Sequence, residues 1–176
     1  MINKIRLVCF YGPESTGKTM MAQKMAAYYK TQWVPEVARE LITSNDFNRE
    51  DIIMIGRAQA ERTFAKARQA NMVLFCDTDL ITTQIYSRHY LGVVPPVLYE
   101  FEKMITYDSY FLFDIDVPWV DDGLRDIGEH EKRTKMLAIF QAELDRRQIP
   151  YVWVRGDWAE REWIIHSEVK KLMTHS

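Results

Sequence analysis

One short stretch near the start of the chain decides its fold: Gly12-Pro13-Glu14-Ser15-Thr16-Gly17-Lys18-Thr19. It matches the phosphate-binding P-loop pattern G-x-x-x-x-G-K-[ST] at every fixed position. In such a loop the glycines let the backbone curl, so that successive N–H groups point at phosphate oxygens. We expect Lys18 to reach the β- and γ-phosphates and the Thr19 hydroxyl to bind Mg²⁺. The residues expected to bind ATP are Gly12, Glu14, Ser15, Thr16, Gly17, Lys18, Thr19 and Met20.

The residues on both sides of the loop fit this interpretation. Residues 4–11 are mostly apolar, β-branched or aromatic, which is typical of a buried parallel strand. After the loop, Met21, Met25 and Tyr28 fall on one face of a helix, with Ala22 and Ala26 beside them. A helix that begins at the end of the loop adds its partial positive charge to the phosphate site. The order of strand, loop and helix therefore favours a P-loop over an ordinary glycine turn.

Apolar strands and helices alternate along the rest of the chain, which predicts an α/β fold of three layers around a five-stranded parallel sheet. The other strands are expected at residues 32–35, 72–76, 110–115 and 151–154. Helices are expected at residues 36–43, 49–69, 81–90, 95–106, 132–148 and from 157 onward. The apolar face of the 49–69 helix is expected to carry Ile53, Gly56, Ala60, Phe64 and Ala67.

Length and composition favour one soluble globular domain, which we take as residues 1–176. Hydrophobic residues make up 47% of the chain and charged residues 27%, as is typical of such a domain. The net charge of −2 gives no basic footprint for nucleic acid or for an anionic membrane. Cys9 and Cys76 both lie in apolar runs, so we expect core thiols in a reducing cytoplasm. We therefore expect a cytoplasmic protein whose partner is a small molecule.

Two carboxylates follow the third expected strand. Asp77 is the natural Walker-B-type group to hold Mg²⁺ beside Thr19, directly or through water. Magnesium keeps several waters, so one or two carboxylates suffice. Asp79 could hold substrate hydroxyls, take part in proton transfer, or cap the next helix. Capping of that helix is also the alternative for Asp77.

An acidic residue also follows the second expected strand. Glu36 lies where the carboxyl ends of parallel strands line a ligand crevice. A carboxylate at this place can accept a proton from an attacking hydroxyl. Arg39, one helical turn further on, could hold a substrate oxygen or orient Glu36. The alternative for this pair is a surface ion pair.

A charged loop with glycines, at about residues 118–131, is expected to be a lid over the phosphate site. Phosphoryl transfer requires positive charge near the transferred group. Arg125 and Arg133 are placed to bring that charge as the lid closes.

The same lid carries a tryptophan and two further carboxylates. Trp119 could stack on a flat heteroaromatic ring, and Asp121 and Asp122 could bind hydroxyls or balance a cationic ring. The alternative is a solvated loop whose tryptophan packs on the core. The other tryptophans are expected to pack in the core or between helices: Trp33, Trp153, Trp158 and Trp163.

The end of the chain carries a turn and a helix start. Asp157 is a candidate N-cap of the last helix, and Glu160 would complete a capping box. Arg155-Gly156-Asp157 spells an adhesion tripeptide, which we interpret as a coincidence. The turn could instead pass near a nucleotide base.

Five segments together resemble one family: Gly12 to Thr19, Pro35-Glu36-Val37-Ala38-Arg39-Glu40, Phe75-Cys76-Asp77-Thr78-Asp79, Tyr107-Asp108 and Pro118-Trp119-Val120-Asp121-Asp122-Gly123-Leu124-Arg125. They resemble the nicotinamide-riboside kinase domain of NadR-type NAD-salvage proteins, in order and over nearly the whole chain. The last segment is the most specific. The resemblance implies ATP-dependent phosphorylation of the 5′-hydroxyl of nicotinamide riboside to nicotinamide mononucleotide. For this reaction we expect Glu36 to position or deprotonate the hydroxyl, with Asp79 as the alternative base.

Some features depart from the family or leave other functions open. The first strand begins at Lys4, so we expect neither a helix-turn-helix nor an adenylyltransferase domain before it. Asp114 and Asp116 stand where neutral residues are expected. One alternative function is a kinase of another nucleoside or small metabolite. Another is a nucleotide-dependent regulatory ATPase, which needs neither the lid tryptophan nor Glu36.

Overall fold

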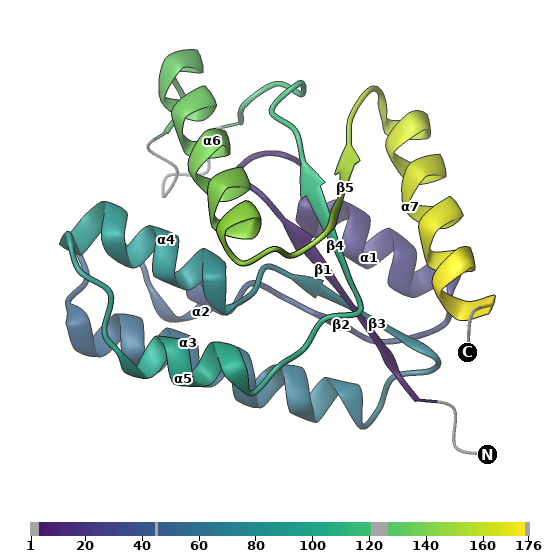
Figure 1. Cartoon of the computed structure of the whole chain (residues 1–176), viewed down its shortest axis with the longest axis horizontal. Helices are drawn as coiled ribbons and strands as arrows, with labels where there is room; N and C mark the ends of the chain where they lie inside the picture. The colour runs from purple at the N-terminus through teal and green to yellow at the C-terminus, as the bar shows by residue number, and fades with distance from the viewer. Residues whose placement is uncertain (1–3, 45, 121–126, 175–176) are drawn as a thin grey trace.

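A five-stranded parallel sheet forms the centre of the molecule, in the order β2-β3-β1-β4-β5 (Figure 1). The computed structural model describes residues 4–44, 46–120 and 127–174. The strands are β1 Arg6–Tyr11, β2 Trp33–Val34, β3 Val73–Asp77, β4 Ser109–Phe113 and β5 Tyr151–Val154. The helices are α1 Lys18–Tyr28, α2 Ala38–Leu41, α3 Arg49–Ala67, α4 Leu80–Leu91, α5 Val97–Lys103, α6 His130–Arg146 and α7 Trp158–Thr174. The predicted fold class is confirmed.

Alternation along β1 explains the three layers, because successive side chains of a strand point to opposite faces. Val8 and Phe10 join a core cluster with α1 and α7 on one face of the sheet. Cys9 and Tyr11 join a second cluster with α4 and α6 on the other face. Figure 1 shows α1 and α7 together on one side of the strands. The central strand is therefore apolar at nearly every position, as its sequence predicts.

The two cysteines lie in neighbouring strands of the core. Cys9 of β1 is in register with Cys76 of β3, and both thiols are buried and free. Burial is the main cause that raises the pKa of each thiol above its ordinary value. The prediction of core thiols is confirmed.

The apolar faces of two helices differ from the sequence prediction. The buried residues of α3 are Ile52, Ile55, Gly56, Gln59, Ala60 and Thr63. Phe64 is partly exposed, whereas Gly56 lies against Leu98 of α5, and the buried face is shifted by about one residue from the predicted one. On α1, Tyr28 is 60% exposed and its ring packs on His166 at the helix end. Local periodicity does not register these contacts between distant segments.

The two unexpected acids after β4, Asp114 and Asp116, form ion pairs with arginines that follow β5 in the chain. Asp114 pairs with Arg155 at 2.7 Å. Asp116 pairs with the buried Arg161 of α7 and also accepts a hydrogen bond from the Gly156 amide. The tripeptide at residues 155–157 thus belongs to the junction of the β4 end with the turn between β5 and α7. The predicted capping box of Asp157 and Glu160 is confirmed, at 2.8 and 2.9 Å.

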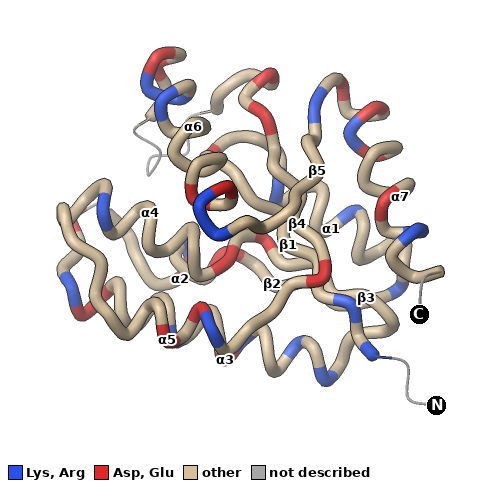
Figure 2. The backbone as a smooth tube through the Cα atoms, viewed as in Figure 1, with Lys and Arg blue, Asp and Glu red and all other residues tan. Residues whose placement is uncertain are grey.

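Charges on the outer helices are mixed in sign (Figure 2). On α6 and the residue before it, Glu129 pairs with Lys132 and Glu131 with Lys135, at helical spacing. Among the described residues, no helix is both long enough and apolar enough to cross a membrane.

Candidate active site

The glycines of the P-loop occupy positions that a side chain could not share. Gly12 has φ of 136°, and a Cβ there would lie 2.8 Å from the Phe113 carbonyl oxygen. Gly17 has φ of 88° and precedes α1, and a Cβ there would lie 2.6 Å from the Trp158 ring. Positive φ and close approach together require glycine at both positions.

The lysine of the loop is held at the loop itself. Lys18 is buried, and its Nζ donates to the Pro13 carbonyl at 2.5 Å and to the Thr16 hydroxyl at 3.3 Å. The Thr16 hydroxyl donates to the same carbonyl at 2.9 Å. The ammonium group therefore lies within the curl of backbone that the sequence predicts as the phosphate cradle.

The predicted metal ligands lie together. Thr19 Oγ1 donates to Asp77 Oδ2 at 2.5 Å. Asp77 is fully buried, and its Oδ1 has no hydrogen-bond partner among the described residues. Burial and the nearby charge of Glu36 raise the pKa of Asp77 to about 6. A hydroxyl and a carboxylate with a free oxygen fit Mg²⁺, which prefers oxygen ligands and completes its shell with water and phosphate.

Asp79 has a different position from the one predicted for a catalytic or substrate-binding group. Its Oδ1 accepts from the amide and the hydroxyl of Thr82, and its Oδ2 accepts from the Tyr110 hydroxyl, all at 2.9 Å. It is the N-cap of α4, and it lines neither the cavity over the P-loop nor the cavity between α2, α3 and α4. Helix capping, one of the alternatives for this residue, is confirmed for Asp79 rather than Asp77. The geometry favours the cap over the catalytic role, because both oxygens are already used.

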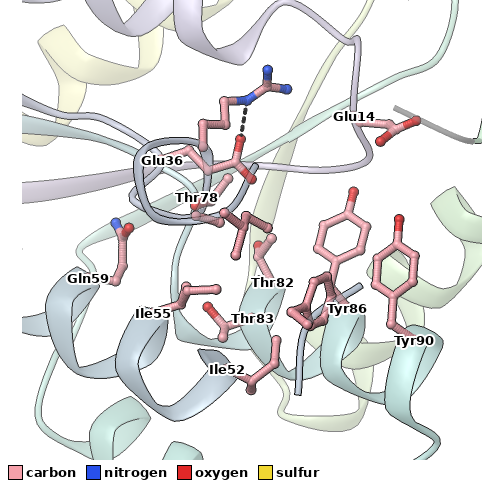
Figure 3. A pocket seen from close by; sticks show the side chains of 14 residues that line it. Glu14, Glu36, Ile52, Ile55, Gln59, Thr78, Thr82, Thr83, Tyr86 and Tyr90 are labelled. Carbon is pink, nitrogen blue, oxygen red and sulfur yellow. Dashed lines mark hydrogen bonds and ion pairs between the residues drawn. The ribbon is translucent and has the colours of Figure 1, made fainter. Parts of the chain in front are cut away.

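Glu36 lies between two cavities. It follows β2, and Oε2 accepts from Arg39 Nε at 2.8 Å (Figure 3). Glu36 and Arg39 line a cavity over the P-loop and also a second cavity between α2, α3 and α4. The ion pair that the sequence left as the alternative is therefore present, both residues also line the two cavities, and a part in proton transfer stays a prediction.

The second cavity, here called the aromatic cavity, has apolar and aromatic walls. Tyr86 and Tyr90 of α4 lie with ring centroids 6.2 Å apart at 22° (Figure 3). Phe47 stands edge-on to Tyr90 at 5.0 Å. The whole lining is Glu14, Glu36, Ala38, Arg39, Ile42, Phe47, Ile52, Ile55, Gln59, Thr78, Thr82, Thr83, Tyr86 and Tyr90. The sequence analysis missed these aromatic residues; their one signal is the i,i+4 spacing of the two tyrosines.

The first cavity, here called the phosphate cavity, extends from the P-loop to the lid base and α7. Its lining is Ser15, Thr16, Gly17, Lys18, Thr19, Met20, Glu36, Arg39, Val117, Pro118, Val120 and Trp158. Trp158 is 44% exposed, although the sequence predicts a packing role for it. Its ring packs on Gly17 and forms a wall of this cavity, so Trp158 is a further candidate site residue.

The base of the predicted lid is fastened to the P-loop. Trp119 Nε1 donates to Glu14 Oε1 at 3.3 Å, and its ring lies against Gly128. The Val120 amide donates to Ser15 Oγ at 2.8 Å. Trp119 lines neither the phosphate cavity nor the aromatic cavity in the described part of the chain. The contacts of Trp119 are with Glu14 of the P-loop and with Gly128, and stacking on a ligand ring stays a prediction.

Arg133 is buried beneath this segment. Its guanidinium donates to the Val117 carbonyl at 3.1 Å and to the Ser15 carbonyl at 3.4 Å. Burial lowers its pKa from the ordinary value. Arg133 thus joins the lid base to the P-loop, and contact with a phosphate stays a prediction. The three other lid residues singled out from the sequence, Asp121, Asp122 and Arg125, lie outside the described residues.

A parallel sheet with a phosphate loop between β1 and α1, and a Thr–Asp pair beside it, defines a P-loop nucleotide-binding domain. The chain belongs to the family described as "AAA domain", whose model matches residues 7–161.

The chain is also similar to a particular group of proteins within that class. It is 30% identical over 159 residues to the trifunctional NAD biosynthesis/regulator protein NadR of Salmonella typhimurium, covering 86% of this chain and 38% of that protein. The protein of the same name from Escherichia coli K12 is 30% identical over 161 residues, covering 87% and 39%. The resemblance seen in the sequence is confirmed, and the chain spans less than two-fifths of the length of these relatives.

Solved structures agree on the fold. A NadR protein in complex with NR has a TM-score of 0.77 and 21% identity, covering 95% of this chain and 51% of that one. A deoxyadenosine kinase from M. mycoides has a TM-score of 0.68 and 11% identity, covering 94% and 99%. At these identities the likeness shows a shared fold.

Proposed function

We propose that the chain is an ATP-dependent kinase that phosphorylates the 5′-hydroxyl of nicotinamide riboside to give nicotinamide mononucleotide. One observation carries the proposal: Glu36 lies where the phosphate cavity meets the aromatic cavity. A donor in one cavity and an acceptor in the other would meet at this carboxylate. The NadR relatives, named for NAD biosynthesis, and the NadR structure with NR support this choice of acceptor.

The donor is proposed to bind in the phosphate cavity. The P-loop amides and Lys18 would hold the β- and γ-phosphates, since the ammonium group already lies in the loop. Thr19 and Asp77 would hold Mg²⁺, which when bound neutralises charge on the phosphate oxygens. Trp158 offers an exposed aromatic face beside Gly17 on which the nucleotide base could stack.

The acceptor is proposed to bind in the aromatic cavity. The nicotinamide ring of the riboside is cationic, and aromatic faces attract cations. Tyr86 and Tyr90 offer such faces, and Glu14 and Glu36 supply negative charge around the same cavity (Figure 3). In this proposal the ring binds at α4 rather than at Trp119, which the sequence suggested for the role. Asp121 and Asp122 remain proposed ligands of the acceptor from the lid.

The proposed mechanism is a direct in-line transfer. Glu36 takes the proton of the 5′-hydroxyl, and Arg39 holds the carboxylate at 2.8 Å in the orientation required. Arg125, with Arg133 at the lid base, adds positive charge near the transferred phosphoryl group. Residues 1–176 act in this proposal as a single kinase domain, in the cytoplasm, where reducing conditions keep Cys9 and Cys76 free.

A coupled assay of ADP release tests the function. The purified chain is incubated with ATP, Mg²⁺ and each member of a panel of ribosides, nucleosides and deoxynucleosides. We expect turnover with nicotinamide riboside well above ATP hydrolysis without acceptor. Turnover of deoxynucleosides alone would assign another nucleoside kinase, and slow hydrolysis with no phosphorylated acceptor would assign a regulatory ATPase.

A further inference from the structure

Gln59 is a buried polar residue in the wall of the aromatic cavity. It lies on α3 with only 2% of its surface exposed, among apolar residues that include Ile52 and Ile55. Figure 3 shows the side chain rising from α3 towards the segment that carries Glu36. An amide in such surroundings requires partners for both of its ends.

One end of the amide has a partner within the chain. Gln59 Oε1 accepts a hydrogen bond from the Val37 backbone amide at 3.1 Å. A backbone N–H can only donate, so the atom that faces it must be the oxygen of the side chain. This fixes the orientation of the amide. It also ties α3 to the residue directly after Glu36.

The nitrogen end of the Gln59 amide has no such partner among the described residues. Nε2 is buried and has no hydrogen-bond partner within residues 4–44, 46–120 and 127–174. A buried donor left unpaired is unfavourable, and native proteins rarely retain one without a reason. Because Gln59 lines the aromatic cavity, a molecule bound there can supply the missing acceptor atom.

The position of Gln59 along the cavity indicates which part of the acceptor it meets. Tyr86 and Tyr90 lie at the opposite end from Gln59 in Figure 3, whereas Glu36 lies near it. If the 5′-hydroxyl meets Glu36 and the ring meets the tyrosines, the sugar joins these two ends and lies closer to Gln59 than the ring does. Its hydroxyl oxygens can accept a hydrogen bond.

We propose that Gln59 is a specificity-determining residue of the acceptor site, whose Nε2 donates a hydrogen bond to the 2′- or 3′-hydroxyl oxygen of the bound riboside. The inference rests on the proposed function and deepens it. The same side chain holds Val37, so a sugar that pairs with Nε2 also steadies the backbone beside Glu36. An acceptor without that hydroxyl leaves the donor unpaired and is disfavoured.

The test compares sugars and variants in one kinetic cycle. Values of kcat/KM are measured for nicotinamide riboside, its 2′-deoxy and 3′-deoxy forms, and a riboside whose ring lacks the carboxamide. The wild type is expected to lose about tenfold or more on one deoxy sugar. Gln59→Leu and Gln59→Glu both remove the donor, so each should lower kcat/KM for the full riboside by a similar factor. For that deoxy sugar, each variant should have the same kcat/KM as the wild type. The effect of the missing carboxamide should be unchanged.

Gln59→Glu keeps an oxygen for the Val37 amide, so it serves if Gln59→Leu does not fold. Thr63→Val is the control, because Thr63 is buried one turn further along α3 and does not line the cavity. It should lower the melting temperature without altering the preference among sugars. The inference would be overturned, but the proposed function would stand, if the Gln59 variants lowered kcat/KM equally for every acceptor or by a factor that depends on the carboxamide. If the wild type phosphorylates no riboside, the proposed function fails and the inference fails with it.

Discussion

At the scale of single residues, the proposed mechanism depends most on Glu36. Glu36→Gln keeps the size of the side chain and its contact with Arg39 but removes the proton acceptor. We expect kcat to fall by about 10²–10⁴, as is usual for loss of a general base, with little change in KM for ATP. Steady-state kinetics with saturating acceptor measures the effect.

Glu40→Gln is the matched control for this variant. Glu40 lies four residues further on, and its carboxylate pairs with Arg62 at a largely exposed site. It should leave kcat within about twofold, since surface ion pairs contribute little. Near-normal turnover by Glu36→Gln would show that another group takes the proton, and Asp79 would then need to break its cap on α4.

Single residues also show where the sequence is informative. Lys18, Thr19 and Asp77 are recognisable because a P-loop and a carboxylate after an apolar strand are local patterns. Gln59 and Trp158 are not recognisable in this way. Their roles depend on contacts with Val37 and Gly17, which lie more than twenty residues away and are brought close only by the packed fold.

At the scale of secondary-structure elements, α7 is connected to the P-loop by Arg161. The Arg161 side chain is completely buried and donates to the carbonyls of Gly156, Thr16 and Asp114, at 2.9, 3.0 and 3.2 Å. It also pairs with Asp116. Arg161→Met should destabilise the protein by about 3 kcal/mol, because it leaves a carboxylate and three carbonyls without their donor. It should also raise KM for ATP, since Thr16 belongs to the P-loop.

Arg155→Met provides the comparison for Arg161. Arg155 pairs with Asp114 at the same junction, but more than half of its side chain is exposed. Its loss should cost less than about 1 kcal/mol. Urea unfolding of both variants measures the difference. Equal destabilisation by the two changes would contradict the assignment of the junction to Arg161.

Helices α4 and α6 are joined by charges that respond to acid. Glu143 of α6 pairs with Arg88 of α4 at 3.0 Å, with Arg146 of its own helix and with Arg147, the C-cap of that helix. Burial opposes its charge, but hydrogen bonds from Arg146 and Arg147 outweigh burial and lower its pKa from 4.5 to about 2. A lowered pKa in the folded state stabilises the protein above the unfolded pKa. This stabilisation should be lost as the pH falls from about 5 towards 2.

Glu143→Gln therefore should flatten the fall in stability over that range of pH. Melting temperatures of wild type and variant, measured from pH 7 to pH 3, test this. The two curves should converge as the pH falls. A constant difference at all pH values would indicate that Glu143 contributes by packing and not by its charge.

At the level of elements, the sequence predicts the strands and most helices well, because hydrophobic periodicity is a local signal. It predicts less well how a helix is rotated about its axis. The inner face of α3 differs by about one residue from the predicted one, because it buries Ile52 and Ile55 rather than Ile53 and Phe64. The aromatic cavity follows from that rotation, since Ile52, Ile55 and Gln59 all belong to the face of α3 that it buries.

At the scale of the whole molecule, the parallel sheet brings two cavities to the same edge, and they share Glu36 and Arg39. The other lining residues belong to only one of the two cavities. A substitution at one of them should therefore change the KM of only one of the two proposed ligands. Trp158→Ala should raise KM for ATP by about tenfold, the loss expected for one aromatic stacking contact, and should leave KM for the acceptor unchanged. Tyr86→Ala should raise KM for the acceptor by a similar factor and leave KM for ATP unchanged.

The two variants test the arrangement as a whole, because each serves as the control for the other. Initial rates measured over a grid of ATP and riboside concentrations give both constants for each protein. Trp163→Ala adds a tryptophan of the same helix that is 70% exposed and outside both cavities, and it should change neither constant. If both variants raised both constants equally, the cavities would form one continuous site. That result would contradict the proposal that donor and acceptor bind in separate cavities and meet at Glu36.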